Sequence, residues 1–273
     1  MNILTKPVLR ADFRIPYGPG PQQFGDLWLP ATPNPPLVVF FHGGWWKSEY
    51  DLGYAGYVCS ALKQAGIATW SVEYRRGGST GGGWPTTFQD VATGFNFVST
   101  IVKSHPLDLT RVITMGHSAG GHLAFWVAGM HHLDTAGELH IAAPSVALRG
   151  AIALAGAVDL QLTIDLSGYG VFSHDKQEVY NLMGGTPHDH PDRYKQADPA
   201  ALLPFNIPQI LIQGTDDDQI PPQLPARYAE KARRIGDTAT VTIIPNSDHF
   251  DVVDPESKAW PTILAAVTKL LRS

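Results

Sequence analysis

The chain of 273 residues has very little cysteine: Cys59 stands alone, so no disulfide can form within the chain. Long apolar runs are also missing, since no stretch of about 18 apolar residues occurs, and we expect no membrane span. The N-terminal stretch MNILTKPVLRADF lacks the apolar core of a signal peptide, so a cytoplasmic protein is the expectation. Acidic residues slightly outnumber basic ones, 25 to 20. The formal net charge of −5 gives no reason to expect nucleic acid or an anionic membrane as a partner.

What the chain does have is a series of short apolar runs that alternate with longer amphipathic ones. With 44% hydrophobic and 16% charged residues, its composition is that of a globular protein. Apolar runs that continue rather than alternate suit a parallel sheet covered on both faces, and they predict strands at 37–41, 67–74, 111–115, 150–158, 209–213 and 240–244. Two strand-like pieces at 13–17 and 24–29, separated by the turn-rich GPGPQQ, predict an antiparallel start of the sheet.

Helical patterns lie between these strands, at 54–65, 87–103, 120–130, 222–235 and 257–271. The alternation predicts an α/β fold in which two layers of helices enclose a mostly parallel, eight-stranded sheet, a three-layer α/β/α sandwich. We expect residues 1–273 to form a single domain. From 160 to 201 the chain has no strong strand pattern and many turn residues, which predicts a lid or cap insertion within that domain.

The pentapeptide GHSAG at residues 116–120 matches the pattern G-x-S-x-G. A predicted strand precedes it and an apolar helical pattern follows, which is the setting of a nucleophile elbow. Glycine at both ends removes Cβ atoms that would collide with neighbouring backbone in so sharp a turn. We therefore expect the Ser118 hydroxyl to stand at the C-terminal edge of the sheet, where open α/β folds bind ligands.

A serine hydroxyl becomes a good nucleophile when a base takes its proton, and the chain offers eleven histidines. His249 follows the last predicted strand, in TIIPNSDHFDVVDP, and so returns to the same edge of the sheet as Ser118. His117 and His122 are closer to Ser118 in sequence, but we expect structural roles for both. The histidines at 131, 132, 188 and 190 have no accompanying cysteines or spaced carboxylates, so neither a metal site nor a cofactor is expected.

The base also needs a carboxylate that fixes its tautomer and stabilises the imidazolium. The stretch GTDDDQIPP, which follows a predicted strand, offers three aspartates at 216–218. The pattern G-x-x-D-x-x-[VI]-P selects Asp217 among them. Ser118, Asp217 and His249 then each follow a strand, in the order that G-x-S-x-G hydrolases use.

The stretch LVVFFHGGWW at residues 37–46 is the second informative motif. Its two glycines fill no volume in a core, but they leave the backbone bare directly after a strand. Acyl transfer needs N–H donors for the oxyanion of its tetrahedral intermediate. We expect Gly44, Trp45 and Ala119 to supply them, helped by the positive end of the helix that follows Ser118.

Large aromatic side chains occur where a substrate pocket is expected. Trp45 and Trp46 directly follow the two glycines, and Tyr169 and Phe172 lie in the predicted lid. We expect these four residues to form the apolar wall of the pocket.

Together these motifs resemble the α/β-hydrolase superfamily, specifically its esterase/lipase branch with an HGG oxyanion loop, over about residues 24–271. The stretch VEYRRGGSTGGGWPTTFQD at 72–90 resembles the D-Y-R…P…D block of that branch. The resemblance implies the α/β-hydrolase fold, with Ser118 as nucleophile, His249 as base and Asp217 as its orienting group. The chain departs from the branch in lacking a long helical N-terminal cap and in having Trp45 after HGG, so the segment 160–201 is expected to serve as the lid.

HGG followed by any residue and tryptophan, at 42–46, and DHFDVV, at 248–253, also resemble kynurenine formamidases, which hydrolyse an aryl formamide. The sequence therefore predicts a serine hydrolase of small carboxylic esters, with an arylformamidase as the alternative. A non-catalytic binding protein of the same fold is less favoured, because no member of the Ser–His–Asp set is missing. The natural substrate, the acyl-chain preference and the oligomeric state do not follow from the sequence.

Overall fold

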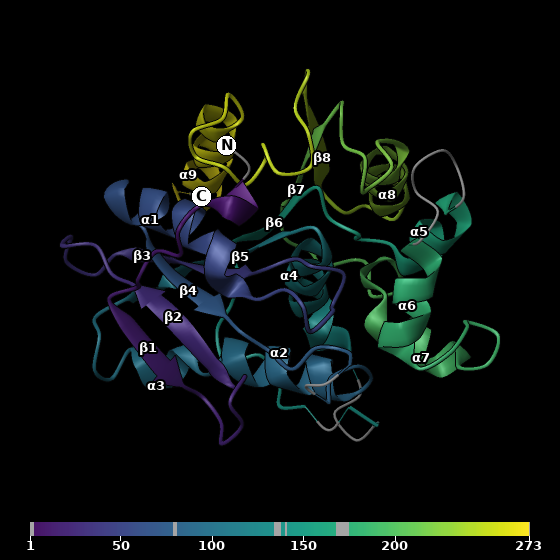
Figure 1. Cartoon of the computed structure of the whole chain (residues 1–273), viewed down its shortest axis with the longest axis horizontal. Coiled ribbons are helices and arrows are strands. Elements are labelled where there is room, and N and C mark those ends of the chain that lie inside the picture. The colour runs from purple at the N-terminus through teal and green to yellow at the C-terminus, as the bar shows by residue number, and fades with distance from the viewer. Residues whose placement is uncertain (1–2, 79–80, 134–137, 140, 168–174, 273) are drawn as a thin grey trace.

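One eight-stranded sheet forms the centre of the structure (Figure 1). The computed structural model describes residues 3–78, 81–133, 138–139, 141–167 and 175–272. Their strands lie in the order β1-β2-β4-β3-β5-β6-β7-β8. The first two are antiparallel to their neighbours and the other six run parallel, which confirms the predicted mostly parallel sheet. The strands are β1 (Phe13–Pro16), β2 (Phe24–Trp28), β3 (Pro36–Phe41), β4 (Ala68–Val72), β5 (Asp108–His117), β6 (Gly150–Leu154), β7 (Gln209–Gly214) and β8 (Ala239–Ile244).

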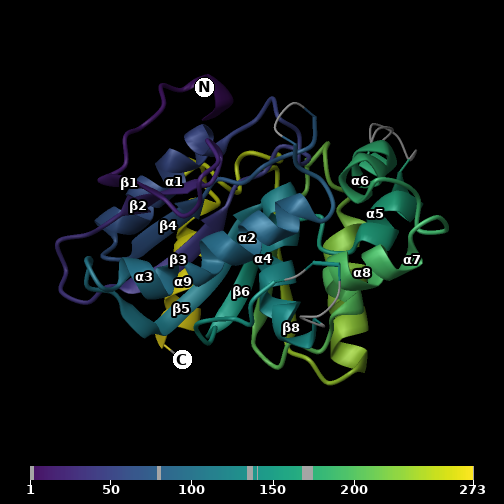
Figure 2. The same cartoon turned by 90° about the horizontal axis from the view of Figure 1, so that it is seen from below.

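Helices cover both faces of this sheet. They are α1 (Gly56–Gln64), α2 (Thr86–Asn96), α3 (Val98–Ile101), α4 (Ala119–Gly129), α5 (Leu160–Leu166), α6 (Asp175–Met183), α7 (Pro191–Ala197), α8 (Gln223–Arg234) and α9 (Trp260–Arg272). Short 3-10 turns occur at η1 (Ile3–Thr5), η2 (Leu52–Ala55), η3 (Met130–His132) and η4 (Pro199–Ala201). In Figure 2, α2 and α4 lie in front of the strands and α9 lies behind them.

The continuous apolar strands are explained by two separate hydrophobic cores, one on each face of the sheet. In β3, Val38 and Phe40 pack with α1 and α9, whereas Val39 and Phe41 pack with α2, α4 and α8. Successive side chains of a strand point to opposite faces, so a strand buried on both faces must be apolar at every position. The three-layer arrangement predicted from the sequence is therefore confirmed.

The segment 160–201 differs from the irregular connection that its turn residues suggested. Its described part carries α5, α6, α7 and η4, which lie together beside α8 (Figure 1). Asp159 caps α5 by accepting a hydrogen bond from Leu162 N at 2.8 Å, and Asp198 caps η4. In the described part, the turn-rich stretch 184–190 links α6 to α7, and these helices are too short to show a clear period in the sequence.

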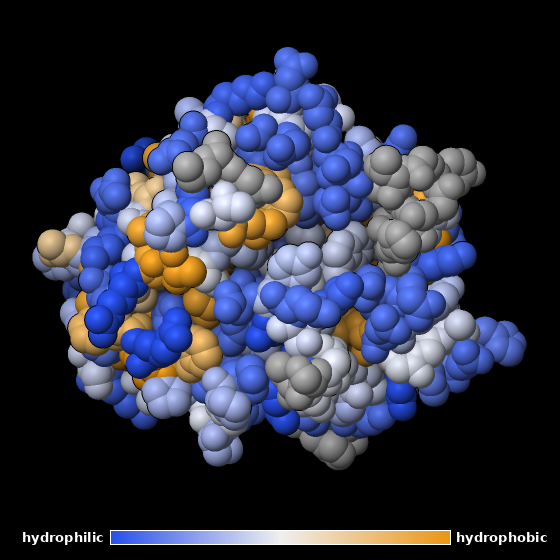
Figure 3. All heavy atoms as spheres, viewed as in Figure 1, coloured by the Kyte–Doolittle hydropathy of each residue, from blue (hydrophilic) through white to orange (hydrophobic). Residues whose placement is uncertain are grey.

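The predicted helix at 87–103 is interrupted, because α2 ends at Asn96 and α3 begins at Val98. The N–H of Thr100 bonds to the carbonyl of Phe97 at 2.8 Å, a tighter turn than that of an α-helix. In the part of the chain that the structure describes, no helix is long and apolar enough to cross a membrane. Apolar residues reach the surface of Figure 3 mainly over β1 to β4, and the surface over α5 to α7 is mostly hydrophilic.

Candidate active site

Ser118 occupies a strained turn between β5 and α4. Its backbone has φ 57° and ψ −123°, a conformation that residues with side chains rarely adopt. A Cβ atom at Gly116 would collide with the carbonyl of Gly120, and one at Gly120 would collide with the carbonyl of Phe41. The two glycines of GHSAG therefore allow the tight turn that lifts Ser118 out at the end of β5, as expected from the motif.

Asp217 and His249 are brought together by the neighbouring ends of β7 and β8. The two strands are paired in parallel up to Gly214 and Ile244, so the loops after them leave the same edge of the sheet. Nδ1 of His249 lies 2.9 Å from Oδ2 of Asp217, and both side chains are buried. Because an ionised carboxylate can only accept, Nδ1 of His249 carries the proton in this contact and Nε2 is left as an acceptor.

The carboxylate of Asp217 is held in place by its own hydrogen bonds. Oδ1 accepts from the backbone N–H groups of Gln219 and Ile220, both at 2.8 Å. Oδ2 accepts from the side-chain amide of Gln213 at 2.7 Å in addition to His249. Gln213 was not identified from the sequence. A polar residue inside the apolar strand QILIQ was the available signal.

Ser118 and His249 line the same small cavity, of about 50 Å³. Trp45, Tyr54 and Gln219 also line it, as do the partly exposed Leu4 and Tyr50. Within the described ranges no hydrogen bond joins the Ser118 hydroxyl to the His249 ring, a contact that in hydrolases often tightens when substrate binds.

The loop after β3 has an unusual backbone. Gly44, Trp45 and Trp46 have φ angles of 113°, 50° and 54°, so three successive residues lie in the region that side chains disfavour. A Cβ at Gly44 would collide with the Tyr50 side chain. Within the described residues, no hydrogen bond takes the N–H groups of Gly44, Trp45 or Ala119. These are the three donors expected from the sequence.

The start of this loop is anchored by buried polar contacts. The His42 ring bonds to the Gly43 carbonyl at 2.8 Å and to Glu73 at 3.0 Å, and Tyr74 donates its hydroxyl to the His42 carbonyl at 2.8 Å. Glu73 also accepts from the N–H of Leu52 at 3.1 Å. The contact between His42 and Glu73 offsets part of the desolvation free energy that burying each of these polar side chains costs. Although burial opposes it, the His42 ring holds the pKa of Glu73 below its usual value.

The two adjacent tryptophans differ in their relation to the Ser118 cavity. Trp45 lines the cavity of Ser118, as expected. Trp46 is 2% exposed and packs edge-on to His122, with ring centroids 5.2 Å apart, so it lies in the core rather than against that cavity. The two rings still touch edge to face, with centroids 6.0 Å apart, and both line the hollow beside helix α6. Tyr169 and Phe172, the other two expected pocket residues, lie outside the described residues.

His122 has the structural role expected for it. One ring nitrogen bonds to the Ala197 carbonyl at 2.9 Å, and Trp126 donates to the Gln196 carbonyl at 2.8 Å, so two residues of α4 hold the end of α7. Burial lowers the pKa of His122 to about 4. In the described part of the chain, no three potential metal ligands lie together.

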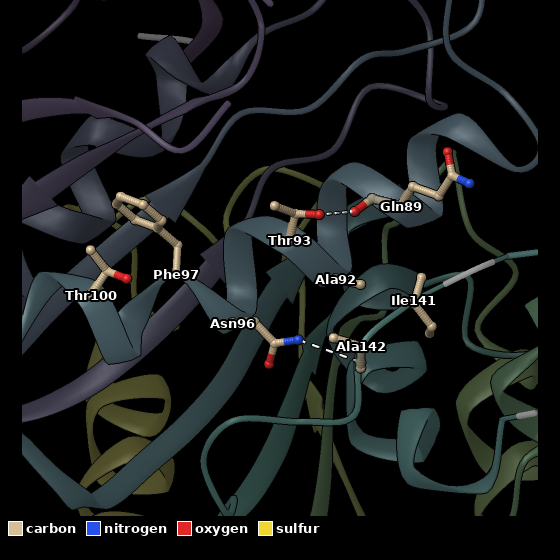
Figure 4. Close-up of a pocket in the computed structure, with 8 residues that line it drawn as sticks. All are labelled: Gln89, Ala92, Thr93, Asn96, Phe97, Thr100, Ile141 and Ala142. Atoms are coloured by element: carbon tan, nitrogen blue, oxygen red, sulfur yellow. Dashed lines mark hydrogen bonds between the residues drawn. The ribbon is translucent and has the colours of Figure 1, made fainter. Parts of the chain in front are cut away.

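Of the larger hollows that do not include Ser118, two lie along α2 and beside α6. One, of about 330 Å³, follows α2 between Gln89 and Thr100 and is closed on one side by Ile141 and Ala142 (Figure 4). The other, of about 400 Å³, lies between the loop of Trp45 and helix α6. Lys47 and Glu178, which line it, form an ion pair at 3.2 Å. The second hollow shares Trp45 with the Ser118 cavity, and the first shares no residue with it.

Solved esterases have the same fold. Esterase B from Lactobacillus rhamnosis superposes with a TM-score of 0.79 at 19% sequence identity, covering 96% of this chain and 87% of that one. A truncated carbohydrate esterase from gut microbiota gives a TM-score of 0.81 at 17% identity, with both chains fully covered. Likeness at this level of identity shows a shared fold.

Two groups of relatives are similar in sequence. A probable isoprenylcysteine alpha-carbonyl methylesterase from Arabidopsis thaliana is 26% identical over 255 residues, covering 87% of this chain and 50% of that protein. A kynurenine formamidase from Danio rerio is 31% identical over 151 residues, covering 54% of this chain and 46% of that protein. The chain thus spans about half the length of these curated relatives.

A protein-family model also matches the chain. The BD-FAE model matches residues 26–231, three quarters of the chain, and includes β2 to α8 with the HGG loop, the elbow and Asp217. The chain belongs to the BD-FAE family and has the α/β-hydrolase fold of esterases.

Proposed function

We propose that this protein is a serine hydrolase that cleaves small carboxylic esters through an acyl-enzyme. The observation that carries the proposal is the 2.9 Å contact of His249 Nδ1 with Asp217, on a ring that lines the cavity of Ser118. A base held in this tautomer presents Nε2 to a nucleophile that a strained turn already exposes. The similarity to methylesterases and to solved esterases supports the same reaction class.

The reaction follows from the placement of these groups. Nε2 of His249 takes the proton of the Ser118 hydroxyl as its oxygen attacks the ester carbonyl carbon. The N–H groups of Gly44, Trp45 and Ala119 bind the oxyanion of the tetrahedral intermediate. The His249 imidazolium, stabilised by Asp217, then gives its proton to the leaving alcohol. Water, deprotonated by His249, attacks the acyl-enzyme, and the acid and free Ser118 are released.

The substrate should be small on its acyl side. The cavity of about 50 Å³ at Ser118 has room for a short acyl group, with Trp45 on its wall and Leu4 and Tyr50 beside it. We assign the segment 160–201 the role of a lid that includes Tyr169 and Phe172, within a single domain of residues 1–273. The ion pair of Lys47 with Glu178 ties the described part of this segment to the oxyanion loop.

Arylformamide hydrolysis is the second candidate. It is favoured by the 31% identity with a kynurenine formamidase over a stretch of 151 residues. The same residues would act, because a formamide has a small acyl part and differs mainly in an amine that must be protonated as it leaves.

A hydrolysis assay with two variants tests the proposal. Ser118→Ala should abolish turnover of p-nitrophenyl acetate and labelling by a fluorophosphonate, whereas Ser60→Ala, on α1 outside the site, should leave both unchanged. Full activity of Ser118→Ala would refute the mechanism. A much higher kcat/KM on N-formylkynurenine than on short p-nitrophenyl esters would put arylformamidase first.

A further inference from the structure

A partly buried chain of hydrogen bonds connects the three loops that meet at Ser118. The N–H of Gly43, in the HGG loop, donates to the Tyr54 hydroxyl at 2.6 Å. That hydroxyl lies 2.9 Å from Nδ1 of His117, the residue before Ser118. Nε2 of His117 lies 2.9 Å from the backbone carbonyl of His249. One phenol and one imidazole thus join the oxyanion loop, the elbow and the loop of the proposed base.

The groups at the two ends of this chain of hydrogen bonds determine which atom donates and which accepts in each bond. A backbone N–H can only donate and a backbone carbonyl can only accept. Nε2 of His117 therefore carries the proton and donates to His249, which leaves Nδ1 as an acceptor. The Tyr54 hydroxyl then donates to Nδ1 while its oxygen accepts from Gly43. The Tyr54 hydroxyl thus accepts one hydrogen bond and donates another, and each nitrogen of the His117 ring has one partner.

Burial keeps His117 in the neutral form that this pattern requires. The residue is 1% exposed, and burial, followed by the neighbouring His249, holds the pKa of His117 well below its usual value. A second proton on Nδ1 would point at the Tyr54 hydroxyl, which would lose its acceptor. The ring also packs against His249, with centroids 4.6 Å apart, and against Phe250 at 5.6 Å.

This chain of hydrogen bonds also determines which backbone N–H groups remain available to bind the oxyanion. Gly43 N–H donates to the Tyr54 hydroxyl, so it is not available to bind an oxyanion. The following amides, of Gly44 and Trp45, donate no hydrogen bond within the described residues and stay available. A Cβ at Gly43 would lie 2.8 Å from both the His117 carbonyl and Ser118 Cβ, so the loop lies directly on the elbow at this point.

We propose that Tyr54 and His117 are positioning residues for ester hydrolysis. Tyr54 holds the oxyanion loop in place by accepting a hydrogen bond from the N–H of Gly43. His117 holds the ring of His249 in place by donating to the backbone carbonyl of His249. This inference rests on the proposed function. Neither side chain needs to touch the reacting atoms. Each fixes a backbone group from which a reacting group projects, and small displacements of such groups are costly to catalysis.

Loss of the two links should have different kinetic signatures. Tyr54→Phe frees the oxyanion loop, which is needed equally for all esters, so kcat/KM should fall by about tenfold or more on both p-nitrophenyl acetate and phenyl acetate. His117→Phe keeps a ring of similar size but frees the His249 loop. Its loss should be larger on phenyl acetate, because phenolate is the poorer leaving group and depends more on proton donation by His249.

The substitution His117→Gln separates positioning from simple packing. Its amide nitrogen can donate to the His249 carbonyl and its amide oxygen can accept from Tyr54, so both links are kept without a ring. We expect kcat/KM within about threefold of the unchanged protein on both esters. Tyr57→Phe is the matched control for Tyr54, since the Tyr57 hydroxyl donates to the Pro7 carbonyl at 2.8 Å away from the cavity.

All variants are compared per folded molecule, with thermal unfolding recorded for each. Wild-type kcat/KM in Tyr54→Phe would overturn the role of Tyr54, and a His117→Gln variant as slow as His117→Phe would overturn that of His117. If His117→Phe does not fold, Tyr54→Phe and His117→Gln still decide. An unaltered protein that hydrolyses neither ester and is not labelled by a fluorophosphonate fails the proposed function itself.

Discussion

Nδ1 of His249 lies 2.9 Å from Oδ2 of Asp217, at the meeting point of the loops that follow β7 and β8. Asp217 has little freedom to turn away, because its two oxygens together accept three further hydrogen bonds from Gln213, Gln219 and Ile220. The carboxylate therefore fixes both the tautomer and the direction of the imidazole. The His249 ring is held from two sides, since its own carbonyl accepts from His117.

The substitution Asp217→Asn tests this relationship. An amide nitrogen at the position of Oδ2 would donate, so His249 would have to present the unprotonated form of Nδ1 and would carry its proton on Nε2, where it cannot act as a base. We expect kcat for p-nitrophenyl acetate to fall by about 10³ to 10⁴-fold, with KM little changed. Asp218→Asn, in the same turn but exposed, is the control and should retain full activity. Equal loss in both variants would point to the turn rather than to Asp217.

Gly44 offers a second test, at the oxyanion loop. Its φ of 113° disfavours a side chain, and an added Cβ would collide with Tyr50. Gly44→Ala should displace the loop and lower kcat by about a hundredfold, the scale of losing one oxyanion donor. Gly81→Ala is a matched control, because Gly81 also has a positive φ, of 72°, but has open space around its Cβ position. It should cost about 1 kcal/mol of stability through backbone strain and leave kcat unchanged.

The parts of the site that follow strands could be predicted from the sequence. Ser118 and Asp217 sit in short motifs whose chemistry depends on local backbone, and parallel strands end at one edge of a sheet. A motif that directly follows a parallel strand thus predicts which loop, at which edge of the sheet, carries the functional side chain. The strands themselves were predicted well because burial on both faces leaves a continuous apolar run.

The contacts that depend on packing across the fold could not be predicted. Tyr54 meets His117 across 63 residues of sequence, and no local pattern marks either as a partner of the other. Trp46 was expected to line the substrate pocket with Trp45, but its ring, although it touches that of Trp45, is buried and does not line the Ser118 cavity. The helices of 160–201 were missed because α5 and α7 have 7 residues each and α6 has 9, too few for a helical period to be visible.

Asp198 predicts a pH-dependent contribution to stability. Burial, and then the nearby Asp159, raises the pKa of Asp198 to about 7. Between its ordinary value of 3.8 and about 7, the folded protein holds a proton that the unfolded chain has released. The free energy of unfolding contributed by this group therefore falls as pH rises through that window.

The substitution Asp198→Asn removes this titration. The melting temperature of the variant, relative to that of the unchanged protein, should be higher at pH 8 than at pH 5. Taking the difference between the two proteins cancels the other titrating groups. Asp192→Asn, at a side chain that is 83% exposed, should show the same relative melting temperature at both pH values. A constant difference for Asp198→Asn would show that this carboxyl does not retain its proton in the folded state.

Trp45 should set the length of acyl chain that the enzyme accepts. Its side chain lines the cavity of about 50 Å³ that also contains Ser118, so replacing the indole with a methyl group opens space where a longer acyl chain would lie. Alanine, like tryptophan, has a Cβ atom, so Trp45→Ala leaves the steric strain of the backbone at its φ of 50° similar. Burying one methylene is worth about 0.8 kcal/mol, or roughly fourfold in kcat/KM, at each position the enlarged cavity can enclose.

The ratio of kcat/KM for p-nitrophenyl hexanoate to that for p-nitrophenyl acetate should therefore rise by about tenfold or more in the variant. Because this ratio does not depend on the concentration of active enzyme, partial unfolding cannot mimic the change. An unchanged ratio would place the acyl chain elsewhere, with the hollow between Trp45 and α6 as the next region to alter.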